Sequence, residues 1–140
     1  MTIAALVTWI VAALGGFYLL ATWLQKGGLR QQRGGPTRFP AALVFGHFLL
    51  AAVGLIVWLV FVFNSSAGTA WTAFVIILVT ALLGFTMFAR WVTGRGQAGG
   101  SSGAGGEVAA EQSFPLTSVL GHGAIAAVTL VLVLIAAVTA

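Results

Sequence analysis

Long apolar runs alternate with short polar segments along this chain, and the runs predict the fold. Each run has the roughly 20 residues that a helix needs to cross the hydrocarbon core of a bilayer. The four runs are Ile3 to Leu24, Ala41 to Phe63, Ala70 to Val92, and Ser118 to Ala140. They lack the alternation of barrel strands, and lipid offers no partners for unpaired backbone groups. We therefore expect an all-α membrane protein, a four-transmembrane-helix bundle.

Composition makes a bilayer the expected solvent. Of the 140 residues, 60% are hydrophobic and only 6% are charged, too few for the surface of a soluble domain. The chain has no cysteine, which excludes disulfides, thiolate metal sites, iron–sulfur clusters and c-type haem attachment. The polar loops show no nucleophile, acid–base pair or metal cluster, so a self-contained enzyme is not expected.

The basic residues predict how the chain is oriented in the membrane. All six lie in the first and third connections, and they are Lys26, Arg30, Arg33, Arg38, Arg90 and Arg95. The turn from Asn64 to Thr69 has no charge. By the positive-inside rule the basic connections are cytoplasmic, and both termini are extracytoplasmic. The net charge of +4 then reflects topology and anionic lipid headgroups, and nucleic acid is not implied as a partner.

An internal repeat is visible when the second and fourth runs are aligned from their prolines. Both contain the pattern FPxxxVxGHxxxAAVxL, beginning at Phe39 and at Phe114. The first and third runs also match near their cytoplasmic ends. There Gly16, Phe17, Ala21 and Trp23 correspond to Gly84, Phe85, Ala89 and Trp91. We interpret the chain as two tandem helical hairpins, residues 1–63 and 64–140, with a flexible Gly-rich loop at 94–106 in the second.

The repeat places one histidine in each half at the same predicted depth. Two copies that enter the membrane in the same sense are related by an axis along the membrane normal. His47 and His122 each follow a helix-starting proline by seven residues, roughly 10 Å at 1.5 Å per residue. Two imidazoles are therefore expected at one level, about a third of the way across from the cytoplasmic side.

Two intramembrane histidines on two helices of a four-helix bundle resemble the ligand arrangement of membrane b-type cytochromes. The resemblance implies one haem b, with His47 and His122 as axial ligands and one-electron transfer as the activity. Gly46 and Gly121 would leave room beside the ligands, and Arg38 and Arg90 would meet the haem propionates. A quinone or another membrane subunit is then the expected redox partner.

Two other hypotheses fit the same residues. The histidines could serve packing through hydrogen bonds between helices, in a non-catalytic membrane scaffold or accessory subunit that could form homo-oligomers. They could also belong to a proton or metal pathway, although no Asp or Glu lies within the apolar runs. The whole chain also resembles small four-span membrane proteins of actinobacterial type. That resemblance implies a bacterial plasma membrane and names no activity.

The tryptophans lie mostly near the predicted helix ends. They are Trp9, Trp23, Trp58, Trp71 and Trp91. Tryptophan at such positions is typical of the aromatic belt at membrane–water interfaces. We therefore expect most of these rings at the lipid-facing surface.

Overall fold

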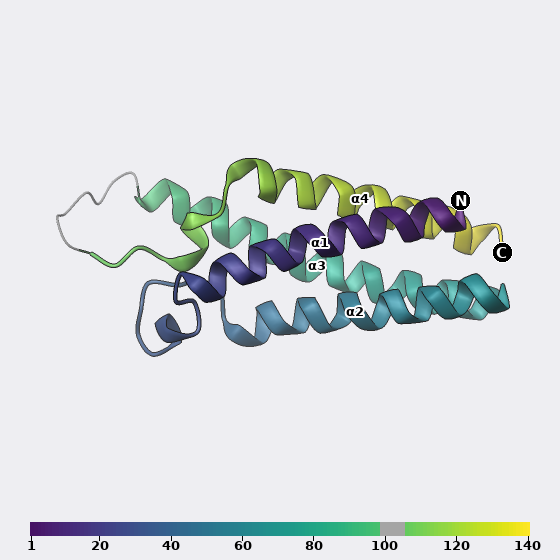
Figure 1. Ribbon diagram of the computed structural model, residues 1–140, viewed down its shortest axis with the longest axis horizontal. Coiled ribbons are helices and arrows are strands. Elements are labelled where there is room, and N and C mark those ends of the chain that lie inside the picture. Colours follow the sequence, from purple (N-terminus) through teal and green to yellow (C-terminus); the bar gives the residue numbers. More distant parts are fainter. Residues whose placement is uncertain (99–105) are drawn as a thin grey trace.

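The computed structural model describes residues 1–98 and 106–140, and they form a bundle of four long helices (Figure 1). The long helices are α1 (Thr2–Gln25), α2 (Ala41–Asn64), α3 (Ala67–Ala98) and α4 (Leu116–Val138). Two short 3-10 helices, η1 (Arg30–Gln32) and η2 (Ala110–Ser113), lie in the first and third connections. All four long helices are long and apolar enough to cross a membrane, which confirms the expected fold class.

The helix boundaries follow the apolar runs closely, with one difference. Pro40 and Pro115 directly precede α2 and α4, where a residue without an N–H removes no helical hydrogen bond. The loop expected to start at Gly94 starts later, because α3 continues to Ala98. The Arg95 guanidinium lies 4.8 Å from the centre of the Trp91 ring one turn earlier, a contact that favours the helical extension. The rest of that loop, 99–105, lies outside the described residues.

The packing pattern places α2 and α4 across the bundle from each other. The closest neighbours are α2 with α3 and α1 with α4, and the remaining contacts join α3 to α4 and α1 to α2. Both termini lie at one end of the bundle, and the first and third connections lie at the other (Figure 1). Large apolar side chains such as Phe63 and Phe85 remain 86% and 70% exposed on the outer surface. An apolar exterior of this kind suits a lipid bilayer.

Two buried clusters fill the bundle and leave a separate level between them. The cluster near the termini contains Trp9 and Trp58, and the cluster near the connections contains Trp23 and Trp91. The expectation of an aromatic belt is therefore wrong for four of the five tryptophans, which are at most 3% exposed; only Trp71 is exposed. The physical reason is volume. The helices carry many Ala and Gly residues, and the large rings fill the space these leave, as Trp9 does beside Gly54.

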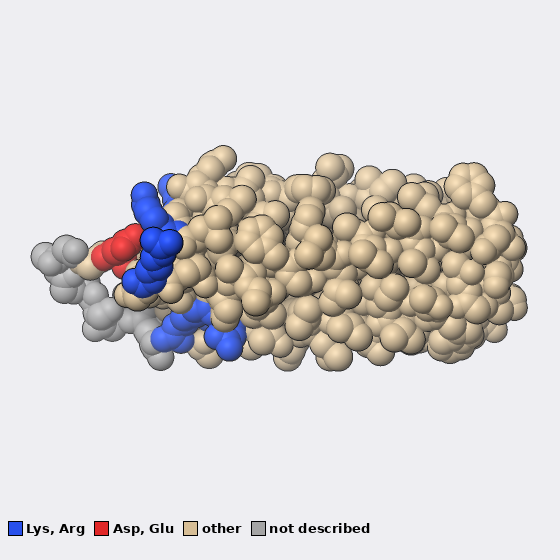
Figure 2. Space-filling view, turned by 90° about the horizontal axis from the view of Figure 1, so that it is seen from below, with Lys and Arg blue, Asp and Glu red and all other residues tan. Residues whose placement is uncertain are grey.

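The first and third connections join into a polar cap, which we define as residues 26–40 and 106–115. Gln31 is 3% exposed, and its amide donates to Glu107 and to the carbonyl oxygen of Val108 and accepts from the N–H of Ala110. Figure 2 shows the charged side chains gathered at this end of the bundle, beside an otherwise uncharged body. Where the connections lack regular structure, side-chain amides therefore provide hydrogen-bond partners for backbone N–H and carbonyl groups.

Candidate functional site

The two histidines face each other between the buried clusters. His47 lies on α2 and His122 on α4, the two helices that stand across the bundle. Their ring centroids are 6.2 Å apart, and the ring planes are inclined at 71°. The structure thus brings together the pair of imidazoles that the sequence placed at one depth.

Each ring is held by one hydrogen bond to a neighbouring helix. The Nδ1 atom of His47 lies 3.0 Å from the carbonyl oxygen of Thr80 on α3, and Nδ1 of His122 lies 2.9 Å from that of Ala12 on α1. Because a carbonyl oxygen can only accept, Nδ1 carries the hydrogen in both rings. Nε2 then keeps its lone pair, so both imidazoles are poised to accept a hydrogen bond or bind a metal through Nε2.

Glycines on α1 and α3 lie directly against these rings. A Cβ added at Gly84 would stand 3.0 Å from Cε1 of His47, and one at Gly16 would stand 3.2 Å from Cε1 of His122. Sequence reasoning aligned this pair in the repeat but did not assign it to the site. The signal was present, because a glycine shared by two helices at the depth of a matched histidine pair indicates a close approach.

The two glycines that the sequence did assign have different surroundings. A Cβ added at Gly46 or Gly121 would meet nothing within 4 Å. Each precedes its histidine in the chain and therefore faces another direction on the helix. Gly46 and Gly121 therefore point away from the imidazoles, whereas Gly84 on α3 and Gly16 on α1 lie against them.

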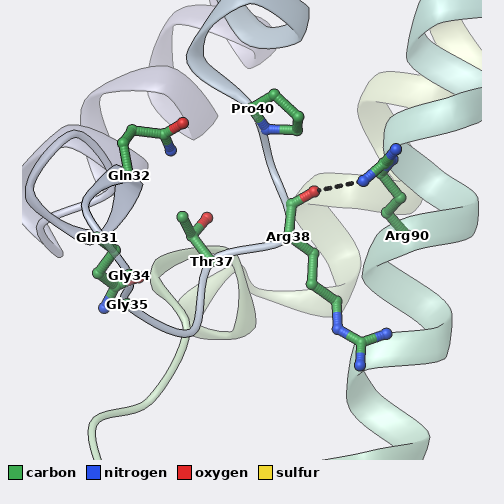
Figure 3. A pocket seen from close by; sticks show the side chains of 8 residues that line it. All are labelled: Gln31, Gln32, Gly34, Gly35, Thr37, Arg38, Pro40 and Arg90. Atoms are coloured by element: carbon green, nitrogen blue, oxygen red, sulfur yellow. Dashed lines mark hydrogen bonds between the residues drawn. The ribbon is translucent and has the colours of Figure 1, made fainter.

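The two assigned arginines lie together at the polar cap. Nη1 of Arg90 on α3 donates to the carbonyl oxygen of Arg38, 3.0 Å away, as the dashed line in Figure 3 marks. Both residues line a pocket of about 290 Å³ between the first connection and α3. Neither histidine lines this pocket, so the arginines and the imidazoles form two separate groups.

A buried carboxylate organises the cap beside those arginines. Glu111 is 0% exposed; it accepts a 2.7 Å hydrogen bond from the Thr37 hydroxyl and a 2.6 Å bond from the Arg38 N–H. Its backbone carbonyl accepts the indole N–H of Trp91 at 3.0 Å. An acidic residue in a polar loop before a membrane span is ordinarily solvated, whereas this carboxylate is fully buried. One residue therefore ties the first connection, η2 and α3 together, through its carboxylate and its backbone carbonyl.

The histidine pair stands apart from other metal-binding side chains. Within residues 1–98 and 106–140, no group of three His, Cys, Asp or Glu is close enough to hold a metal ion. The chemistry of the site therefore depends on the two imidazoles. No protein-family model matches the sequence, and no curated protein or solved structure shows significant similarity to it.

Proposed function

We propose that this membrane protein binds one b-type haem between His47 and His122 and serves as a small electron-transfer subunit. The observation that carries the proposal is the facing pair of imidazoles with Nδ1 engaged on both sides. The proposal concerns the site only, and the four-helix bundle stands independently of it.

The spacing of the two rings suits a metal between them. Bonds of about 2 Å from iron to two imidazole nitrogens would place the ring centroids about 6 Å apart. The observed separation of 6.2 Å is close to this value.

The hydrogen bonds at Nδ1 favour the same assignment. A histidine that ligates a metal usually donates its other ring N–H to a carbonyl or carboxylate, which fixes the tautomer and raises the basicity of the ligating nitrogen. Thr80 and Ala12 supply such carbonyls. The contacts of Gly84 and Gly16 with the rings limit how far each imidazole can tilt.

The residues around the histidine pair determine which chemistry a bound haem could carry out. His47 and His122 would hold the haem iron, and the group would then supply single-electron transfer. Apolar helices around the pair would keep water from it, and the arginines of the cap form a group separate from the imidazoles. A membrane quinone or a second membrane subunit would supply or accept the electron, because the lipid-facing surface carries no charged groups at this depth.

We further propose that the two hairpins arose by duplication and share a two-fold axis. His47 of the first hairpin bonds α3 of the second, and His122 of the second bonds α1 of the first. The acceptors occupy matching positions, because Ala12 precedes Gly16 by four residues and Thr80 precedes Gly84 by four. Two equivalent contacts, which join two pairs of aligned positions, support a symmetric origin.

The proposed location is a bacterial plasma membrane with the polar cap in the cytoplasm. Every Lys and Arg belongs to the connections at the cap end or to the part of α3 next to them. The positive-inside rule then places both termini outside.

A specific observation also favours the scaffold hypothesis. Both histidine bonds cross between the two hairpins, as expected for polar groups that hold membrane helices together. In that case Nε2 would have no metal, and the protein would be an accessory subunit. The two functions make opposite predictions about bound cofactor.

The absorption spectrum of detergent-purified protein from haem-replete cells distinguishes them. A haem protein should show a Soret band and, after dithionite reduction, a sharp alpha band. Both bands should disappear in His47→Asn and His122→Asn, in which the amide nitrogen can replace Nδ1 in the carbonyl bond. Monodisperse elution of these variants would show that the fold survives. A colourless preparation, or bands that persist in both variants, would reject the haem assignment.

A further inference from the structure

The pocket in the polar cap has the character of an anion site. Its walls are the first connection and α3, and its volume is about 290 Å³ (Figure 3). Glutamine, threonine, glycine and arginine line most of it. Such walls suit a small charged group rather than an acyl chain or an aromatic ring.

Most of the neutral polar groups in this pocket already have partners within the protein. The Gln32 amide donates to the carbonyl oxygens of Gly28 and Phe39 and accepts from the Ala41 N–H. Gln31 is likewise engaged with the segment 107–110. These bonds hold the glutamine side chains in place. The guanidinium of Arg90 is then the group that can recognise a ligand, because one of its N–H groups donates to the Arg38 carbonyl and other N–H donors remain.

The charges around the pocket favour an anion. Arg38 and Arg90 line it, and Arg30 and Arg33 belong to the same connection. The opposing groups are Glu107, which accepts a hydrogen bond from Gln31, and Glu111, whose carboxylate is fully buried and engaged by Thr37 and by the Arg38 N–H. The two arginines line the pocket itself, and neither acid does. Arginine recognises the oxygens of phosphate through paired N–H donors.

The position of the pocket identifies the source of the phosphate. Its lining includes Pro40, the residue directly before the membrane helix α2, so the pocket lies where the polar cap meets the apolar helices. Lipid headgroups occupy this level in a bilayer. We propose that this pocket binds the phosphodiester headgroup of an anionic phospholipid, with Arg90 as the principal contact. The inference goes beyond the proposed function and does not depend on haem.

The test compares lipid binding by wild-type protein and two charge-matched variants. Colourless protein, prepared without haem, is placed in nanodiscs of phosphatidylcholine containing a minor fraction of phosphatidylglycerol, and native mass spectrometry measures retained phosphatidylglycerol. Arg90→Gln removes the proposed contact. Arg95→Gln removes one charge from the same helix, at a residue that stacks on Trp91 and does not line the pocket.

Wild type and Arg95→Gln should both retain phosphatidylglycerol, and Arg90→Gln should retain it about tenfold less, the loss expected for a charge-assisted contact. Equal losses in both variants would overturn the proposal, because they would indicate only general surface charge. Absence of any preference for phosphatidylglycerol over phosphatidylcholine would overturn it too. Inorganic phosphate that competes at millimolar concentration would instead identify a free phosphate site and overturn the lipid assignment.

Discussion

The Nδ1 atom of His122 lies 2.9 Å from the carbonyl oxygen of Ala12, and this contact joins the last helix to the first. Its counterpart joins His47 to Thr80. The bonds have a structural effect whether or not a metal binds at Nε2. Substitutions can therefore separate the contribution to folding from the contribution to ligand binding.

We expect His122→Ala to lower the free energy of unfolding by about 1 kcal/mol, because hydrogen bonds between membrane helices contribute about that much. His122→Asn should recover most of the loss, since its amide can reach the same carbonyl. Denaturant unfolding of the haem-free protein in mixed micelles measures both. Equal destabilisation by the two substitutions would contradict a structural bond at Nδ1.

The glycines against the rings provide a matched pair of substitutions. Gly84→Ala places a Cβ 3.0 Å from Cε1 of His47, so the ring must move, and we expect a cost of about 1 to 3 kcal/mol. Gly46→Ala meets nothing within 4 Å and should be neutral or slightly stabilising through helix propensity. Thermal unfolding followed by circular dichroism gives the two Tm values. A Gly84→Ala variant as stable as Gly46→Ala would show that the approach is not tight.

The buried carboxylate of Glu111 should control the order of the polar cap. Glu111→Ala leaves the Thr37 hydroxyl and the Arg38 N–H without their acceptor, a cost of about 1 to 3 kcal/mol for groups removed from water. Limited trypsin digestion in nanodiscs should then cut faster after Arg33 and Arg38. Glu107→Ala is the control, because Gln31 keeps its bond to Val108 when Glu107 is lost. Similar digestion of both variants would assign Glu111 no special role.

The orientation in the membrane can be tested because the chain has no cysteine. Single cysteines at Ser66, in the turn between α2 and α3, and at Leu29, in the polar cap, are both at exposed positions and keep all basic residues. A membrane-impermeant maleimide should label Ser66→Cys in intact cells and should label Leu29→Cys only after permeabilisation. The reverse pattern would place the cap outside and contradict the positive-inside prediction.

The spans and the histidine pair were predictable because the evidence for each is local or repeated. Continuous apolar runs predict the helices because their length matches the thickness of the bilayer core. The repeated Gly-His pattern predicts that the two histidines lie at one depth. The contacts of Gly16 and Gly84 were not assigned, because a repeat shows which positions correspond and not which neighbours they touch. Only the alignment of Gly16 with Gly84 in the repeat pointed to these contacts.

The tryptophans and Glu111 show what a linear pattern leaves open. Distance from a helix end does not tell which side of the helix a ring occupies, so Trp9 and Trp58 were expected at the lipid surface although they fill the core. The burial of Glu111 depends on Thr37 and Arg38, which lie more than 70 residues earlier. The helical residues 94–98 were hidden by their glycines, since composition alone is typical of a linker.

The polar cap has a consequence for the order in which the chain is assembled during translation. Gln31 and Thr37 emerge from the ribosome long before the segment 107–111 that supplies their partners. The first hairpin can therefore form before its polar connection has all of its hydrogen-bond partners. A chain interrupted before residue 107 leaves the Gln31 amide and the Thr37 hydroxyl without the groups that they bond in the complete protein.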